Sequence, residues 1–327
     1  MKALFILFTF FSATFLSAYD SIHVELGIPI STNSTPFVQI QRSQYWLNFK
    51  PMYGNPEWVA WNLNKDWYGD IDRYSGNFIT DTTLPIEWRI KHDDYTNSGY
   101  DRGHMVRSEE RTQTVADNKA TFIMTNIIPQ TPELNRNTWL DFERYCENLC
   151  KKDNKELYIY AGPQYNTNPD KIKEKVLIPD SCFKIVVIMN RGEGVEQVNE
   201  NTPIVAVMMP NNQDVKNNEW LEYQRTVRNI ERSTGIDFLT KLPQNLQDIL
   251  ENKLTTSVQD NVTTTLSVYP NPATAFINVT GSDNFVIYDI YGGMIGLYHR
   301  SKVDVSNLPR GIYLLRSGNE FVKVVKY

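Results

Sequence analysis

The sequence has few of the residues that build disulfide frameworks or metal clusters, and it has no excess of positive charge. Its 327 residues include three cysteines and four histidines, and the formal net charge at pH 7 is -5. No CxxC pair or nearby histidine supplies tetrahedral spacing, so we discount a cysteine zinc site. A global basic field that would attract a polyanion is also excluded. Any binding of nucleic acid must therefore come from a local cluster of cations.

Long apolar runs are missing too, except at the start of the chain. Met1 and Lys2 precede an apolar stretch from Ala3 to Leu16, which closes on small residues at 17–18. This pattern predicts a secretory signal peptide over residues 1–18, with a buried helix or a membrane anchor as the alternative. After its removal we expect no stable membrane span and a protein that acts outside the inner membrane.

Export would permit disulfides. Cys146 and Cys150 lie four residues apart in a predicted helix, which suits a shared face better than a bond between them. We therefore expect one disulfide from Cys182 to one of these two residues, and one free thiol.

Residues 19–254 mix short β-rich runs with helical ones, which predicts an α+β domain. The nearly continuous apolar runs indicate a central sheet covered on both faces. The predicted strands cover residues 58–63, 120–125, 156–160, 183–188 and 204–208. Helices are expected at 135–149, where Trp139, Phe142, Cys146 and Leu149 follow helical spacing, at 220–232 with a stop near Gly235, and at 243–254.

The composition changes after residue 254. Residues 255–265 are polar and rich in threonine, as in a linker. Short alternating runs at 266–269, 276–279, 285–289, 311–315 and 321–325 follow, separated by turn signals, and they predict a small all-β sandwich over 266–327.

A group of polar residues near position 100 could hydrolyse a phosphodiester. That reaction needs a base to deprotonate water, and positive charge to stabilise the pentacovalent oxyanion and the leaving alkoxide. Arg102 and His104 flank Gly103, which would let the backbone approach a bulky ligand. A lone histidine in a polar loop is more often a surface residue, so these residues need support from the rest of the chain.

Three segments in order resemble the DNA/RNA non-specific endonuclease family. They are residues 100–104 (Tyr-Asp-Arg-Gly-His), 125–130 (Thr-Asn-Ile-Ile-Pro-Gln) and 134–143 (Leu-Asn-Arg-Asn-Thr-Trp-Leu-Asp-Phe-Glu). The resemblance runs from about residue 58 to 253. It implies a ββα-metal fold with a central, largely antiparallel sheet, and an enzyme that cuts DNA and RNA without sequence preference.

The resemblance also implies roles for single residues. His104 would be the general base, and Arg102 would contact phosphate. Asn135 would be the direct protein ligand of one Mg²⁺, with Mn²⁺ as the alternative cation, and Glu143 would hold the waters of that ion. Asn126 would orient the site.

Arg73 would stabilise the transition state, although the sequence around it matches the family loosely. The segment after His104, residues 105–111, departs from the small apolar residues of many relatives and puts substrate preference in doubt. Mg²⁺ needs few protein oxygens because it keeps most of its waters, which agrees with one amide ligand and one carboxylate at a distance. The products would carry a 5′-phosphate and a 3′-hydroxyl.

The C-terminal segments resemble the sorting domain of the type IX secretion system. The likeness rests on residues 267–273 (Ser-Val-Tyr-Pro-Asn-Pro-Ala), 287–293, 305–313 and the basic end at 323–327. It implies the type IX machinery as a partner, a Bacteroidetes-like Gram-negative source, and a secreted or surface-attached protein. A small adhesive or carbohydrate-binding sandwich is the alternative.

Together these features predict a secreted, metal-dependent endonuclease acting on DNA and RNA, with a homodimer as one option for its oligomeric state. The absence of a helix-turn-helix, zinc finger or RNA-binding motif agrees with cleavage at any sequence. Two alternatives stay open. One is a nucleic-acid-binding or adhesive surface protein on a degenerate nuclease scaffold, and the other is a phosphodiesterase for small substrates.

Overall fold

A computed structural model of the chain describes residues 21–254, 266–282, 284–291, 293–298, 301–317 and 320–327. The predicted signal peptide at 1–18 and the linker at 255–265 lie outside the described residues. The chain divides into two compact units, residues 1–257 and 258–327, and each is described by itself. No helix among the described residues has the length and apolar character needed to cross a membrane.

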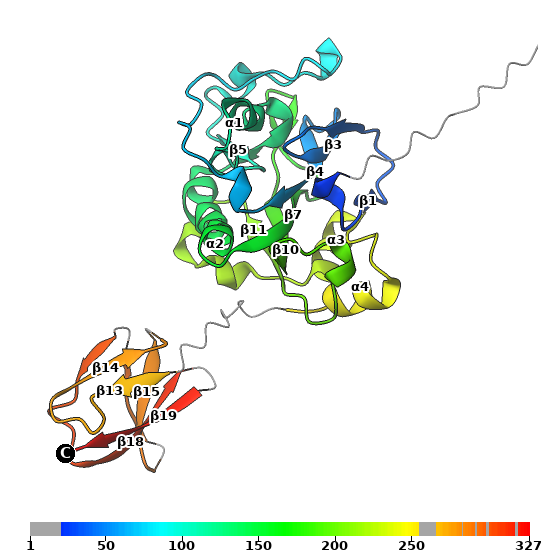
Figure 1. Cartoon of the computed structure of the whole chain (residues 1–327). Coiled ribbons are helices and arrows are strands. Elements are labelled where there is room, and N and C mark those ends of the chain that lie inside the picture. Colours follow the sequence, from blue (N-terminus) through cyan, green and yellow to red (C-terminus); the bar gives the residue numbers. More distant parts are fainter. Residues whose placement is uncertain (1–20, 255–265, 283, 292, 299–300, 318–319) are drawn as a thin grey trace, which may run out of the picture. The chain divides into compact units, whose positions relative to one another are not determined.

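The larger unit is built on a six-stranded sheet in which every pair of neighbours is antiparallel (Figure 1). In spatial order, the strands are β11 (Ile204–Pro210), β10 (Ser181–Asn190), β7 (Lys155–Gln164), β4 (Asn55–Leu63), β3 (Trp46–Lys50) and β2 (Val38–Gln41). The described strands thus agree with the α+β class and the largely antiparallel sheet that the sequence predicts.

Both faces of this sheet are covered, as the continuous apolar runs predict. All nine residues of β4 are buried. Alternate residues of β10 point to opposite faces, so Phe183 and Ile185 pack on one side with α3 and α4, while Lys184 faces α2 on the other. The helices are α1 (Val115–Thr121), α2 (Trp139–Lys151), α3 (Val227–Thr234) and α4 (Gln244–Leu250).

Three two-stranded pairs complete the unit. They are β1 (Ile30–Ser31) with β12 (Ile236–Asp237), β5 (Asp101–His104) with β6 (Ile127–Gln130), and β8 (Lys171–Ile172) with β9 (Val176–Leu177). The β5–β6 pair followed by α2 forms a ββα unit beside the central sheet.

α2 has the amphipathic pattern read from the sequence, with a difference at its start. Trp139, Phe142, Cys146 and Leu149 are all buried, as their spacing predicts. The helix does not begin as a regular α-helix at residue 135, however. Residues Leu134–Thr138 form a π-helical turn that leads into α2. Such turns are rare and occur often at functional sites.

Two sequence predictions of secondary structure are wrong. Residues 120–125 are not a strand, because Thr114 caps α1 and the chain passes from that helix into a 3-10 turn at Met124–Asn126. Residues 220–232 are not one helix. A 3-10 turn at Trp220–Tyr223 is followed by an extended pair that bonds to β11, and α3 begins only after its cap at Thr226. Gly235, with φ of 71°, ends α3 as predicted.

The predicted disulfide is also wrong. Cys146, Cys150 and Cys182 are all free and buried. Burial raises the pKa of Cys146 and of Cys182 to about 12, so both remain neutral thiols. The Cys150 thiol donates a hydrogen bond to the carbonyl of Leu63. Cys146 and Cys150 pack the space between α2 and the sheet as small apolar side chains, and Cys182 is buried on β10.

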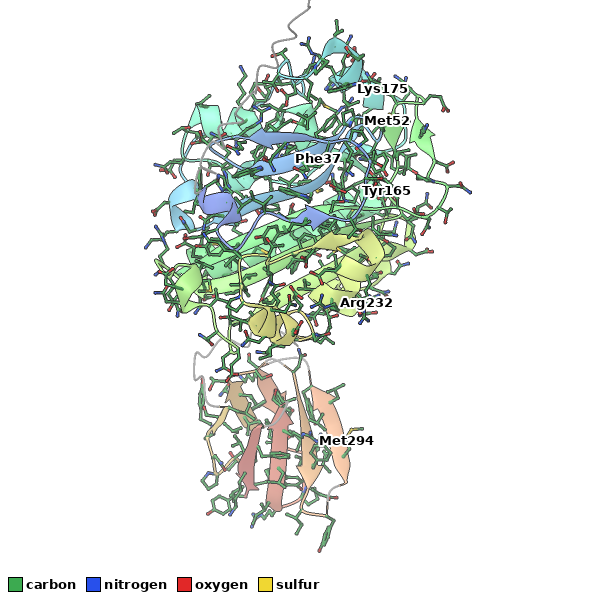
Figure 2. All side chains as sticks on the ribbon, turned by 90° about the vertical axis from the view of Figure 1, so that its right-hand side faces the viewer. Phe37, Met52, Tyr165, Lys175, Arg232 and Met294 are labelled. Carbon is green, nitrogen blue, oxygen red and sulfur yellow. The ribbon has the colours of Figure 1, made fainter. Side chains whose placement is uncertain are left out.

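The smaller unit is a two-sheet β-sandwich. One sheet has β13 (Ser267–Tyr269), β14 (Phe276–Thr280) and β17 (Lys302–Asp304). The other has β16 (Met294–Tyr298), β15 (Phe285–Asp289), β18 (Gly311–Ser317) and β19 (Glu320–Lys326). Ile277 and Val279 from the first sheet pack with Ile287 and Leu315 from the second, while the side chain of Met294 on β16 is exposed (Figure 2).

His23 is held in the neutral form by its two neighbours in the larger unit. Its Nδ1 accepts a hydrogen bond from the backbone N–H of Asn62 at 3.1 Å, so the proton lies on Nε2, which donates to the carbonyl of Ser43 at 2.9 Å. A second proton on Nδ1 would face the Asn62 N–H. Burial, and next the charge of Arg111, lower the pKa of His23 to about 4.

This arrangement predicts a pH-dependent contribution of His23 to stability. Its pKa in the fold lies below the ordinary value of 6.5, so between pH 6.5 and 4 only the unfolded chain binds this proton. The stabilisation is present above pH 6.5 and is lost as the pH falls. The free energy of unfolding of wild type relative to His23→Gln should fall by about 1.4 kcal/mol per pH unit in this window. Urea unfolding of both proteins at pH 7.5, 6 and 5 measures this difference in free energy. If the difference does not change with pH, the lowered pKa of His23 is disproved.

Candidate active site

The β5–β6 pair places His104 at the end of a short strand. His104 lies opposite Ile127, and Arg102 lies opposite Pro129. Gly103 is needed for a different reason from the one that the sequence suggests. A Cβ atom at this position would overlap the buried side chain of Gln130, so the close approach is to Gln130 and not to a ligand.

The His104 ring packs against two aromatic side chains, which also contact each other. Its centroid lies 5.2 Å from that of Phe78 and 4.9 Å from that of Phe122, the latter edge to face. The Nε2 atom is buried and has no hydrogen-bond partner among the described residues. Burial, followed by the positive charge of Arg73, lowers the pKa of His104 to about 3. The ring is therefore neutral at pH 5 to 8 and can accept a proton.

A cleft of about 350 Å³ brings His104 together with most of the other predicted site residues. Arg73, Arg102, Asn135 and Glu143 all line it. The sequence analysis gave no role to seven further lining residues, which are Phe78, Arg107, Ser108, Glu109, Arg136, Leu140 and Arg144. The lining contains five arginines and two glutamates, which makes it the local cation cluster that an acidic chain needs to bind a polyanion.

A larger cleft of about 1000 Å³ has the opposite charge. Its lining includes Glu25, Glu156, Glu193 and Glu196 but only one cation, Lys241. These carboxylates would repel a phosphate backbone, so we place the candidate site in the smaller, arginine-rich cleft.

The guanidinium of Arg102 is held by a backbone carbonyl of the turn that precedes β5. Its Nη2 and Nε donate to the carbonyl of His92, at 2.8 and 3.2 Å. The guanidinium also lies over the rings of Phe78 and Tyr95. These contacts hold the cation at the cleft. No carboxylate of the described residues forms an ion pair with it, so its charge is available to a phosphate.

Asn126 does not line the cleft. It is fully buried, its Oδ1 accepts from the N–H of Val106, and its Nδ2 donates to the carbonyls of Val106 and Thr121, all at 2.9 to 3.0 Å. The structure therefore places Asn126 behind the wall of the cleft, where it holds the segment that follows His104.

Asn135 lies in the π-helical turn before α2, and its amide orientation follows from its partner. The amide nitrogen lies 2.9 Å from Asp101 Oδ2, and Arg136 pairs with the same carboxylate at 2.6 and 2.7 Å. A carboxylate accepts hydrogen bonds and donates none, so the amide nitrogen faces Asp101 and Oδ1 is left for another partner.

Glu143 is a buried carboxylate on the same helical segment, eight residues beyond Asn135, which is about two turns. Its Oε1 lies 3.5 Å from Nζ of Lys184, and its Oε2 lies 3.6 Å from Nε of Arg107. Burial raises the pKa of Glu143, while the charges of Lys184 and Arg107 oppose that rise. Lys184 is itself buried over the ring of Trp139.

These donors fit one hard, mostly hydrated dication such as Mg²⁺. Asn135 offers a neutral amide oxygen and Glu143 a charge, which is a small set of protein oxygens for an ion that keeps its waters. Elsewhere among the described residues, the three carboxylates of Glu231, Asp237 and Glu251 lie close enough together to hold a metal ion. Arg228 pairs with Glu231 at 2.9 Å and with Glu251 at 2.5 Å, so we assign no metal there.

Residues 107–111, the charged part of the segment 105–111 that departs from the family pattern, divide between two roles. Glu110 and Arg111 point inward: Glu110 accepts a hydrogen bond from the Trp61 indole at 2.9 Å, and Arg111 donates to the carbonyls of Gln44 and Asn62. Arg107 and Glu109 line the cleft. Four of these five residues are charged, which could have marked the segment as more than a surface loop.

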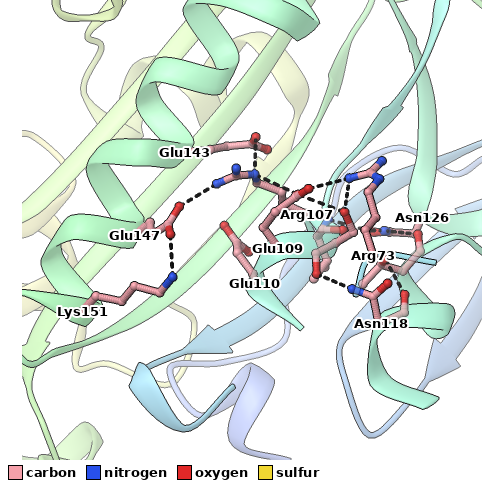
Figure 3. Close-up of polar contacts among 12 residues, drawn as sticks. Arg73, Arg107, Glu109, Glu110, Asn118, Asn126, Glu143, Glu147 and Lys151 are labelled. Carbon is pink, nitrogen blue, oxygen red and sulfur yellow. Dashed lines mark hydrogen bonds and ion pairs between the residues drawn. The ribbon is translucent and has the colours of Figure 1, made fainter. Parts of the chain in front are cut away.

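Arg73 is placed in the cleft by contacts with that segment. Its Nη1 pairs with Glu109 Oε1 at 2.7 Å and donates to Ser108 Oγ, and its guanidinium lies over the Phe122 ring (Figure 3). The structure thus joins Arg73 to the other candidate residues, although the sequence around it offers little support.

Both compact units of the chain match known protein families. A family profile described as DNA/RNA non-specific endonuclease matches residues 27–245, and one described as a secretion system C-terminal sorting domain matches residues 267–326. A nuclease of Nostoc sp. is 42% identical over 247 residues, which cover 74% of this chain and 89% of that protein.

More distant relatives share the fold. Mitochondrial endonuclease G of Homo sapiens is 26% identical over 222 residues, covering 62% of this chain and 69% of that protein. A chain in the crystal structure of the EndoG/EndoGI complex matches with a TM-score of 0.59 and 23% identity, over 73% of this chain and 97% of that chain.

Proposed function

The chain belongs to the DNA/RNA non-specific endonuclease family, and we propose that it is a secreted endonuclease that hydrolyses both DNA and RNA without sequence preference. The observation that carries this proposal is the single cleft lined by Arg73, Arg102, His104, Asn135 and Glu143. It holds a base, cations and oxygen donors, and phosphodiester hydrolysis needs all three.

His104 accepts the proton of the attacking water. His104 lines the cleft and its ring is neutral, so the ring can do this. A base with a strongly lowered pKa is weak, but a phosphate that pairs with Arg73 removes part of the positive charge that lowers the pKa of His104. Substrate binding therefore strengthens the base.

The arginines bind the phosphate and stabilise the charge that develops on it. Arg102, anchored through the carbonyl of His92, contacts a non-bridging oxygen, and Arg73 contacts the transition state. Asn135 would be the direct protein ligand of Mg²⁺ and Glu143 would hold the waters of that ion, with Mn²⁺ as the alternative cation. A bound dication supplies positive charge for the departing 3′ oxygen. The products are a 5′-phosphate and a 3′-hydroxyl.

Cleavage at any sequence follows from contacts of this kind. Arginines that bind phosphate oxygens confer affinity but carry no base information. We also propose that residues 1–18 direct export, that residues 266–327 engage the type IX secretion machinery, and that the enzyme acts outside a Bacteroidetes-like cell or on its surface. The match to a sorting domain supports this localisation.

The substrate range and the product ends test the proposal. Purified protein should degrade plasmid, single-stranded DNA and RNA in Mg²⁺, and EDTA should abolish all three activities. Polynucleotide kinase should label the products only after phosphatase treatment, because a 5′-phosphate blocks labelling. Salt-sensitive binding without cleavage would favour a degenerate scaffold, and cleavage of nucleotide diesters but not of polymer would indicate a small-substrate phosphodiesterase.

A further inference from the structure

We propose that Arg107 is a positioning residue of the metal site: it holds the Glu143 carboxylate in place and, through Glu109, links that carboxylate to Arg73. The inference rests on the proposed function, which makes Glu143 a partner of the hydrated cation.

Arg107 lies among three carboxylates (Figure 3). Its Nε is 3.1 Å from Glu109 Oε2 and 3.6 Å from Glu143 Oε2, and its Nη1 is 2.9 Å from Glu147 Oε2. These partners come from two elements, because Glu109 belongs to the turn after β5 while Glu143 and Glu147 belong to α2. Arg107 therefore ties the segment that follows His104 to the helix that carries the metal-binding side chains.

Burial separates this contact from an ordinary surface ion pair. The side chains of Arg107 and Glu143 are 15% and 6% exposed, whereas exposed pairs contribute little. Each oxygen of Glu143 faces one cation, Lys184 on one side and Arg107 on the other. If one cation is removed, a buried carboxylate keeps a single charged partner and loses its fixed orientation.

Glu109 extends the link across the cleft. Its Oε1 pairs with Arg73 at 2.7 Å and its Oε2 with Arg107 at 3.1 Å. Arg73, Glu109, Arg107 and Glu143 thus form one chain of alternating charge, from the arginine assigned to the transition state to the carboxylate assigned to the metal. Because one carboxylate serves both arginines, Arg107 also sets the resting position of Arg73.

The competing role for Arg107 is that of a counter-ion that a metal must displace. A guanidinium close to a cation site repels the cation, so its removal would then tighten metal binding. The surroundings favour positioning, because Glu147 holds the guanidinium more closely than Glu143 does, at 2.9 against 3.6 Å. Arg107 can therefore stay on Glu147 when a hydrated cation binds. The two roles therefore predict opposite changes in metal affinity when Arg107 is removed.

Binding of Mn²⁺ alone, without nucleic acid, decides between them. In the full chain, Arg107→Met should weaken Mn²⁺ affinity about tenfold by calorimetry or by electron paramagnetic resonance of the free ion. Arg107→Lys should restore part of it, because the charge stays while the planar fork is lost. Arg144→Met is the matched control: Arg144 lines the same cleft but pairs with the exposed Asp141, so Mn²⁺ affinity should match wild type.

Kinetics give a second readout. For Arg107→Met, kcat should fall at low Mg²⁺ and recover at saturating Mg²⁺. Unaltered or tighter Mn²⁺ binding in Arg107→Met would overturn the inference. If Arg107→Met fails to fold, the Mn²⁺ affinity of Arg107→Lys is compared with that of wild type instead. A loss of less than tenfold is then expected, and unaltered or tighter binding would overturn the inference.

The two proposals can fail separately. A wild-type protein that binds Mn²⁺ but cuts nothing would refute the proposed function, and a loss of affinity in Arg107→Met would still support positioning. An active wild type with an unaffected Arg107→Met would refute only the role of Arg107.

Discussion

His104→Ala should lower the rate of plasmid cleavage at saturating Mg²⁺ by about 10²- to 10⁴-fold, the usual contribution of a general base. No other histidine of the described part of the chain lines the cleft, so no neighbouring imidazole there can replace it. The rate of conversion of supercoiled plasmid to nicked and linear forms measures the loss.

His23→Gln is the control for His104→Ala, since it also removes a buried histidine but lies outside the cleft. Folded His23→Gln should cut at the wild-type rate. His104→Ala also leaves a space beside the rings of Phe78 and Phe122, where added imidazole should restore part of the activity. An undiminished rate in His104→Ala would refute the mechanism.

Asn135→Ala should lower kcat at millimolar Mg²⁺ by about 10²- to 10³-fold, a loss typical of removing one electrostatic donor from an active site. The amide oxygen of Asn135 is the direct protein ligand in the proposed site, and Asp101 fixes its orientation. The affinity for Mn²⁺ without substrate should fall together with the rate.

Asn137→Ala is the matched control for Asn135→Ala. It removes the same side chain from the same π-helical turn, but its amide donates only to the carbonyl of Glu133. Its rate and its Mn²⁺ affinity should stay close to wild type. If Asn135→Ala binds Mn²⁺ as tightly as wild type, Asn135 is not a ligand of the metal.

The local sequence pattern predicted the elements in which buried apolar residues recur regularly along the chain. β4, β7, β10 and β11 were predicted because a strand covered on both faces is apolar at nearly every position. The pattern failed where capping and tertiary hydrogen bonds decided the structure. Residues 120–125 have an apolar run but follow a capped helix, and residues 224–225 are drawn into extended pairing with β11.

The cysteines are a second case in which tertiary packing, and not the sequence pattern, decided the structure. Export chemistry permits a disulfide, but whether two thiols meet depends on the packing of α2 against the sheet. In the structure Cys146 and Cys150 face the sheet from α2, Cys182 is buried on β10, and all three are separate thiols.

The sequence by itself determined the chemical types of the site and their order: a histidine after an arginine, then an asparagine and a glutamate on one helical segment. It also determined the two-part organisation of the chain, through the change in composition near residue 255. Only the tertiary structure decided that Arg73 reaches the cleft, that Asn126 stands behind it, and that Arg107 and Glu109 connect Arg73 to Glu143. The reason is physical. Periodicity records which face of an element is buried, whereas the partner of a charge depends on distances of a few ångströms between elements far apart in the chain.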